Sequence, residues 1–389
     1  MSNDISKVVS NLYKKQKDFF ASQITKTNAY RIQKLKSLRK EINTRELEIH
    51  EALKQDMRKP TFEAMTSETV LVDKELSLMI KMLPLWNKTR RAKSSLINFP
   101  SKDYIKSEPF GNTLMISPWN YPFQLAITPL IGAVAAGNTV VLKPSEYAPH
   151  TSGVIQKIIR NVFDSGHVSV LEGDSTVASE LLKKRWDFIM FTGSTRVGKI
   201  IAQAAALHLT PTTLELGGKS PCVVDDSAPI GITAKRIVWG KFLNCGQTCI
   251  APDYLLVNEK IKSKLVTAIT KEIERAFGKN QKKSDDYGRI AHLNHFKKLK
   301  TAIKGEKVIY GGETDEKSLY FSPTLVENIS KESVLMKEEI FGPVLPIISY
   351  DKESEIHYFL KSQERPLAFY VFSKRNKFIN QLFNRYSFG

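Results

Sequence analysis

Two cysteines four residues apart, Cys245 and Cys249 in "FLNCGQTCIAPDY", are the first residues of this 389-residue chain whose types and spacing could do chemistry. A metal site would need further Cys or His ligands nearby, and the spacing matches neither CxxC nor a zinc pattern. The chain holds three cysteines, which suits a reduced cytoplasmic protein better than a disulfide scaffold. We therefore expect no metal, and the segment is either a buried structural stretch or the position of a thiol nucleophile.

A second candidate is the turn "FTGSTRVGKI", for which three interpretations stand. Gly193, Gly198 and Lys199 match part of a phosphate-binding P-loop, but Ile200 stands where magnesium needs Ser or Thr. A strand-to-helix turn could instead hold a dinucleotide pyrophosphate on its free N–H groups, with Ser194 adding a hydroxyl. A plain tight turn of an α/β domain is the third interpretation.

The strand end "TVVLKPSE" is a third candidate, because it delivers Lys143 and Glu146 into a loop. Open α/β sheets bind ligands where their strands end, so an ammonium and a carboxylate here could bracket the ribose hydroxyls of an adenosine group. The same two residues also fit an ordinary surface ion pair.

These candidates lie in a chain whose patterns alternate between helix and strand. The first ninety or so residues are mainly helical in pattern. After them, "TVVLKPSE" and "WDFIMFTGS" predict strands, and "TSGVIQKIIRNVF" and "RVGKIIAQAAA" predict helices. This alternation predicts an α/β fold with a parallel sheet covered on both faces. With 389 residues and 42% apolar content, two or more domains are expected.

The distribution of apolar and charged residues excludes several classes. The run "LAITPLIGAVAAGNTVVL" is broken by Pro129 and Gly132, so it predicts a buried helix and a strand rather than a membrane span. The N-terminus has no apolar core of a signal peptide. The net charge is +18, but the lysines are mixed with acids along helical segments, which favours solvated helix faces over nucleic-acid binding. Peripheral contact with an anionic membrane stays open.

Five segments, "SPWNYP", "KPSE", "FTGSTRVG", "LELGGKSP" with "NCGQTC", and "EEIFGP", carry a family resemblance. Their order and spacing resemble the NAD(P)-dependent aldehyde dehydrogenase superfamily, and "IAPDY" and "DYGRI" are similar to its class-three branch. That branch includes bacterial enzymes acting on fatty, aromatic or carotenoid aldehydes. The resemblance implies a Rossmann-like NAD(P)-binding domain over residues 1–98 and 112–215, an oligomerisation hairpin that includes 99–111, and an α/β catalytic domain over 216–389.

The resemblance also implies the catalytic roles. Cys249 matches the family's nucleophile, which leaves Cys222 and Cys245 as small buried hydrophobic residues. Asn120 would stabilise the oxyanion together with the backbone N–H of Cys249, since an amide donates a hydrogen bond without competing for the proton. Glu215 would be the general base, for which apolar surroundings and a raised pKa are suitable.

A cofactor, NAD or NADP, is implied by further matches. Glu339 would accept hydroxyls of the nicotinamide ribose, and Phe341 would pack beside it. Trp119 and Lys143 match positions that line the adenosine half. Arg196 stands where the family usually has an acidic residue in the pyrophosphate turn.

The chain ends at "NRYSFG", where the family continues through a strand, a glycine-rich loop and a final strand used in dimer formation. We therefore expect a C-terminally truncated form of the fold and a homodimer for the complete chain. The expected function is oxidation of a long-chain, aromatic or carotenoid-type aldehyde to a carboxylic acid. Three rivals are a catalytically silent NAD-binding relative, a CoA-acylating relative, which Glu215 disfavours, and a P-loop NTPase, which Ile200 disfavours.

Overall fold

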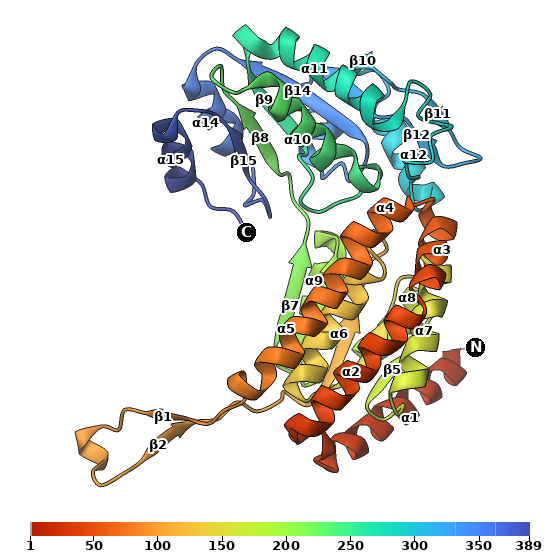
Figure 1. Ribbon diagram of the computed structural model, residues 1–389, viewed down its shortest axis with the longest axis vertical. Coiled ribbons are helices and arrows are strands. Elements are labelled where there is room, and N and C mark those ends of the chain that lie inside the picture. The colour runs from red at the N-terminus through yellow and green to blue at the C-terminus, as the bar shows by residue number, and fades with distance from the viewer. Residues whose placement is uncertain (1, 331, 362) are drawn as a thin grey trace. The chain divides into compact units, whose positions relative to one another are not determined.

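The computed structural model describes residues 2–330, 332–361 and 363–389, and the chain divides into two compact units (Figure 1). Unit 1 comprises Met1–Leu53 and Ala64–Glu215, and unit 2 comprises Lys54–Glu63 and Leu216–Gly389. Each unit contains a largely parallel sheet and helices. The α/β fold class predicted from the alternating pattern is therefore confirmed.

The first part of the chain is helical, as its pattern predicts. A short 3-10 turn (Ile24–Lys26) and a π-helix, η2 (Met65–Thr69), interrupt the α-helices. The α-helices are α1 (Ser2–Ala21), α2 (Asn28–Thr44), α3 (Glu46–Met57), α4 (Thr61–Ala64) and α5 (Val70–Trp86). The buried apolar side chains of α2 and α5 belong to the core of unit 1, together with those of the sheet and of the helices that follow.

The sheet of unit 1 has five strands in the order β5-β4-β3-β6-β7. All five residues of "TVVLK" are buried in a central strand, which explains its continuous apolar run. The strands are β3 (Asn112–Ile116), β4 (Thr139–Lys143), β5 (Val168–Val170), β6 (Phe188–Gly193) and β7 (Thr212–Leu216). The helices between them are α6 (Gln124–Ala136), α7 (Pro149–Val162), α8 (Ser175–Leu182) and α9 (Thr195–Ala206).

The longest apolar run of the chain forms α6 and then β4. Gly137, in the left-handed conformation with φ 92°, ends the helix and lets the chain turn into the strand. No helix in the described parts of the chain is long and apolar enough to cross a membrane.

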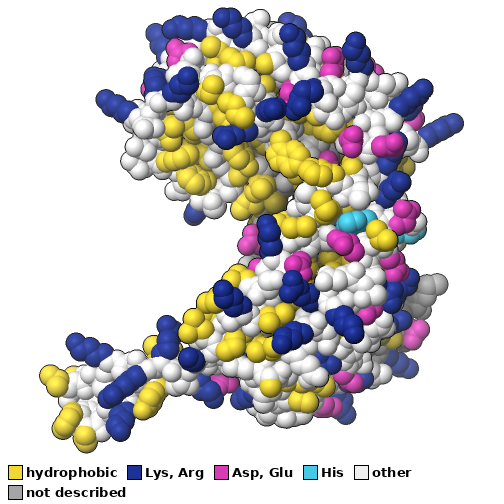
Figure 2. Space-filling model, viewed as in Figure 1, with side chains coloured by type: hydrophobic (Ala, Val, Ile, Leu, Met, Phe, Trp, Pro, Cys, Tyr) yellow, Lys and Arg dark blue, Asp and Glu magenta, His cyan; other side chains and the backbone are white. Residues whose placement is uncertain are grey.

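An antiparallel hairpin of unit 1 joins β1 (Arg90–Ala92) to β2 (Asp103–Ile105) through the short turn η3 (Leu96–Asn98). The expected oligomerisation segment 99–111 contributes β2. Three apolar side chains near the tip, Leu96, Ile97 and Phe99, are at least 80% exposed. Figure 2 shows hydrophobic side chains at this tip with basic ones beside them. It also shows Lys and Arg spread over both units, interspersed with acidic side chains.

Unit 2 contains a six-stranded sheet in the order β10-β13-β14-β9-β8-β15, parallel except for the β10/β13 pair. Its strands are β8 (Pro221–Val224), β9 (Tyr254–Asn258), β10 (Lys307–Tyr310), β13 (Thr324–Glu327), β14 (Val344–Tyr350) and β15 (Tyr370–Phe372), with a small separate pair, β11 (Thr314–Asp315) and β12 (Tyr320–Phe321). Its helices are α10 (Ile230–Phe242), the 3-10 turn η4 (Leu243–Gly246), α11 (Glu259–Phe277), α12 (Leu293–Ala302), α13 (Val334–Lys337), α14 (Glu353–Lys361) and α15 (Asn376–Arg385).

A buried imidazole in unit 1 makes stability depend on pH. The His167 ring is fully buried and stacks on Phe19. Burial, aided by the nearby Lys34, lowers its pKa to about 4, whereas an unfolded histidine titrates near about 6.5. Below that pH the unfolded chain binds a proton that the folded chain does not, so this contribution to stability is lost as the pH falls towards 4.

We expect His167 to account for a loss of about 2 kcal/mol of stability between about pH 7.5 and pH 5. The variant His167→Phe keeps an aromatic ring against Phe19. Between the same two pH values its free energy of unfolding should fall by about 2 kcal/mol less than that of the parent chain. Thermal unfolding at the two pH values measures the difference. His208→Phe, just after α9, is the control and should behave as the parent chain does. An identical pH response of His167→Phe and the parent would contradict the assignment.

Candidate active site

The carboxyl ends of three strands meet at one edge of the unit 1 sheet. The strand order reverses at β3, since β4 and β5 lie on one side of it and β6 and β7 on the other. Ile116, the last residue of β3, is paired with Lys143 of β4 and with Phe191 of β6. The N–H of Ser117 extends this register by donating to the Lys143 carbonyl at 3.1 Å. Open α/β sheets bind ligands at such a reversal point.

The turn from β6 into α9 lies at this edge. Ser194 is the N-cap of α9, and its Oγ accepts a hydrogen bond from the Val197 N–H at 3.5 Å. A Cβ on Gly193 would lie 2.5 Å from the ring of Phe191, so a side chain there would displace the ring. The first N–H groups of a helix have no intrahelical acceptor, and they suit an anionic ligand.

Gly198, Lys199 and Ile200 lie inside α9 rather than in the turn. Gly198 is buried, whereas the Ile200 side chain is 49% exposed. An aliphatic side chain cannot ligate a hard cation. The P-loop interpretation therefore gains no support from this geometry.

Lys143 and Glu146 form an ion pair of 2.7 Å at the end of β4. The Lys143 side chain is buried and that of Glu146 is partly exposed. The hydroxyl of Ser117, at the end of β3, is buried without a hydrogen-bond partner among the described residues. Buried polar atoms are normally satisfied. Lys143, Ser117 and the start of α9 therefore all lie where neighbouring parallel strands end, and their donor groups are of the kinds that bind hydroxyls and phosphates.

Trp119 and Asn120 follow β3 at the same edge and precede α6. Asn120 is buried and Trp119 is half-buried. Glu215 lies near the carboxyl end of β7 and is exposed. The general-base role of Glu215 stays a prediction, and within unit 1 its position at the end of the edge strand β7 is what the structure describes.

In unit 2, a strained backbone segment precedes Cys249. Asn244, Cys245 and Gly246 all have left-handed backbone, with φ of 53°, 55° and 74°. For residues with a side chain this conformation costs about 1–3 kcal/mol. A Cβ on Gly246 would overlap the carbonyl oxygen of Gly342, so glycine is required for the close approach of these two segments.

Side-chain hydrogen bonds hold the strained segment. The Gln247 amide nitrogen donates to the carbonyls of Asn244 and Arg289, each at 3.0 Å, and its oxygen accepts from the Ala291 N–H at 2.9 Å. The Asn244 N–H donates to the Glu63 carboxyl at 2.9 Å. Burial raises the pKa of Glu63 to about 7. These contacts were not predicted, because Gln247 looks like any loop residue in sequence.

The three cysteines differ in their surroundings. Cys222 lies in β8 and Cys245 in η4, and both are fully buried, as the sequence predicts. Burial raises the pKa of Cys222 and raises that of Cys245 to about 12. Cys249 is half-buried. Within the described ranges no three His, Cys, Asp or Glu residues are grouped so that they could hold a metal ion.

Glu339 and Phe341 lie between α13 and β14. The Gly218 N–H donates to the Glu339 carboxyl, and a Cβ on Gly217 would overlap the same carboxyl. Burial, with the nearby Asp253, raises the pKa of Glu339 to about 7. Phe341 has left-handed backbone, φ 52°, and its carbonyl accepts from His295 Nε2 at 2.7 Å.

A buried ion pair that sequence reasoning missed ties these segments together. Lys219 donates to Asp253 and also to the carbonyls of Leu335 and Glu338, at 2.7 and 3.0 Å. Asp253 in turn accepts from the Ile340 N–H at 3.1 Å. Lys219 in "GGKSP" and Asp253 in "APDY" are each the single charged residue of a nearly uncharged stretch. This isolation is the sequence feature that could have indicated a buried ion pair.

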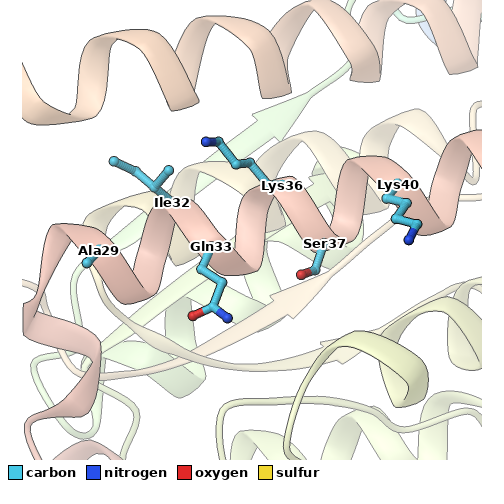
Figure 3. Close-up of a pocket in the computed structure, with 6 residues that line it drawn as sticks. All are labelled: Ala29, Ile32, Gln33, Lys36, Ser37 and Lys40. Atoms are coloured by element: carbon cyan, nitrogen blue, oxygen red, sulfur yellow. The ribbon is translucent and has the colours of Figure 1, made fainter.

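A surface hollow of about 410 Å³ lies elsewhere in unit 1, on α2. Figure 3 shows Ile32 and Lys36 pointing to one side of the helix and Gln33 and Ser37 to the other. These side chains do not converge on a common point. The hollow contains none of the candidate site residues, and we assign it no role.

Comparisons with known proteins match nearly the whole chain to one family. The profile of the Aldehyde dehydrogenase family matches residues 2–389. A 4,4'-diaponeurosporen-aldehyde dehydrogenase of Staphylococcus aureus is 42% identical over 384 residues, which cover 98% of this chain and 84% of that protein. The Mus musculus protein called aldehyde dehydrogenase family 3 member A2 is 41% identical over 370 residues, 95% of this chain and 76% of that protein.

A solved structure is also similar. The substrate-bound Staphylococcus aureus AldH matches with a TM-score of 0.95 and 41% sequence identity. The match covers 97% of this chain and 83% of that one.

The different burial of the three thiols predicts their reactivity. We expect one cysteine, Cys249, to react rapidly with Ellman's reagent in the native protein, and all three to react in denaturant, because a buried thiol with a raised pKa forms little thiolate. Absorbance of the released thiolate counts the reacting groups. Cys249→Ala should remove the fast phase and Cys222→Ala should retain it. Rapid native labelling that persists in Cys249→Ala would contradict the prediction.

Proposed function

Because this chain belongs to the aldehyde dehydrogenase family, in the class-three-like branch that its sequence resembles, we propose that its nucleophile is the Cys249 thiolate. The chain is an oxidoreductase that converts an aldehyde to a carboxylic acid with NAD or NADP. One observation carries the proposal: Cys249 is half-buried just after a strained segment, whereas the other two cysteines are fully buried.

Each proposed residue has one role. The Cys249 sulfur forms a bond to the aldehyde carbon, and the aldehyde oxygen takes up the negative charge. The Asn120 side-chain amide and the Cys249 backbone N–H donate hydrogen bonds to that oxygen. NAD(P)+, when bound, supplies the acceptor for the hydride that leaves the same carbon. Glu215 takes a proton from the water that attacks the resulting thioester, and the carboxylic acid leaves as the thiolate is restored.

The donor set at the edge of the unit 1 sheet supports a cofactor site there. We propose that the residues that hold the cofactor are Trp119, Lys143, Glu146, Gly193, Ser194 and Gly198 in unit 1, and Glu339 and Phe341 in unit 2. On this proposal residues 1–98 and 112–215 are the NAD(P)-binding domain and 216–389 the catalytic domain. Residues 99–111 belong to an oligomerisation hairpin.

For the substrate, the assembly and the location we propose only a class. The proposed substrate is a long-chain, aromatic or carotenoid-type aldehyde, and the Staphylococcus relative is named for 4,4'-diaponeurosporen-aldehyde. The exposed apolar tip of the β1–β2 hairpin supports its use in a homodimer. We also propose peripheral contact with an anionic membrane. It is supported by the basic residues that flank the tip, Arg90, Arg91 and Lys102. The low number of cysteines, three in 389 residues, supports a cytoplasmic location.

The nucleophile assignment predicts that Cys249→Ala abolishes aldehyde oxidation with both a long-chain and a short-chain aldehyde, because the covalent intermediate cannot form. Cofactor reduction followed by absorbance measures the rate. Cys222→Ala and Cys245→Ala are the matched controls and should retain most of the activity. Substantial oxidation by Cys249→Ala would remove the basis of the assignment.

The general-base assignment predicts a different kinetic signature. Glu215→Gln should slow thioester hydrolysis more than the formation of the thioester, because the amide cannot accept the proton of the attacking water. Rapid-mixing absorbance should show a burst of reduced cofactor followed by very slow turnover. An unchanged steady-state rate would place the base elsewhere.

A further inference from the structure

Glu68 is a fully buried carboxylate in the π-helix η2, between α4 and α5 of the chain. π-helical turns are rare and occur often at functional sites. Nothing in the roles proposed above uses Glu68.

The Glu68 carboxyl receives two backbone hydrogen bonds at the start of α6. Its Oε2 accepts from the N–H of Phe123 at 2.9 Å and from the N–H of Gln124 at 3.0 Å. The N-cap residue of α6, Phe123, supplies no side-chain cap of its own. A carboxylate at a helix N-terminus satisfies free N–H groups and is stabilised by the helix dipole. Glu68 thus caps α6 from a distant part of the chain.

This cap fixes one end of the short segment that carries Asn120. The segment leaves β3 at Ser117, whose N–H donates to the Lys143 carbonyl at 3.1 Å. It enters α6 at Phe123 and Gln124, where Glu68 holds it. Asn120 lies between these two anchors. Hydrogen bonds to a charged acceptor are stronger than those to a neutral one, so loss of the Glu68 anchor would free one end of the segment.

We propose that Glu68 is a positioning residue for Asn120: its carboxylate holds the start of α6 so that the Asn120 amide is presented to the oxyanion. This inference rests on the proposed role of Asn120. Glu68 acts through the backbone of residues 123 and 124 and forms no bond to the substrate. Positioning of a donor matters because displacement of a reacting group by about 1 Å can reduce the rate about 10²-fold.

A double-mutant cycle tests the proposal in the full chain. Asn120→Ala alone should lower kcat by about 10²–10³-fold, as loss of one oxyanion donor does. Glu68→Gln should lower kcat by about 10-fold, since the amide oxygen can still accept but lacks the charge that strengthens both hydrogen bonds. If Glu68 acts through Asn120, Glu68→Gln should have little further effect in the Asn120→Ala background.

Two further variants serve as a control and as a graded change. Glu46→Gln alters a neighbouring carboxylate that accepts from the Thr69 hydroxyl at 3.1 Å and does not cap α6, so it should keep the parent kcat. Glu68→Asp keeps the charge but shortens the reach, and it should give an intermediate loss of kcat. The cofactor dissociation constant, measured by fluorescence, shows that each variant is folded.

The outcomes separate the two proposals. If Asn120→Ala lowers kcat but Glu68→Gln does not, or lowers it by the same factor in both backgrounds, the positioning role is overturned and the oxyanion role stands. If Asn120→Ala leaves kcat unchanged, the oxyanion role itself is overturned. A loss in Glu68→Gln that disappears in the Asn120→Ala background supports both.

Discussion

The strained backbone from Asn244 to Gly246 is the constraint on which the nucleophile segment depends. Left-handed conformations at Asn244 and Cys245 are unfavourable for residues with a Cβ, so they persist only where neighbouring contacts determine them. Gln247 makes three such contacts with backbone groups, and they can offset a cost of this size. The turn sends the Cys245 thiol into the core, against Tyr287, whereas Cys249 stays half-buried.

In unit 1 the corresponding constraint is the register of the strands. Because β3 pairs with both β4 and β6, the residues that follow these strands are delivered to one edge of the sheet. Strand pairing therefore positions the starts of these loops, and the Glu68 carboxyl holds the end of the one that enters α6. The segment before Cys249 is positioned by side-chain hydrogen bonds to the backbone.

This difference explains what could be predicted from the sequence. Lys143 and Gly193 follow strands that are recognisable from apolar runs, so their common edge follows from the α/β pattern. The choice of Cys249 over Cys245 came from the family resemblance, since spacing alone does not distinguish them. Glu68 and Asp253 were missed because their partners lie 55 and 34 residues away along the chain. The residues next to a buried charged side chain do not distinguish it from an exposed one when its partner is distant in the sequence.

The buried charges of unit 2 also bear on Glu339. Lys241 is fully buried, 4.0 Å from Asp253, and burial lowers its pKa to about 8. Burial raises the pKa of Glu339 to about 7, while Lys219 and Lys241 oppose this shift. Two ammonium groups and two carboxylates have no net charge when all four are ionised, and removing one of the four then leaves an uncompensated buried charge. The pKa of Glu339 is therefore raised mainly by burial and by Asp253, and Lys219 and Lys241, to which no nucleophile or cofactor contact has been assigned, act against that rise.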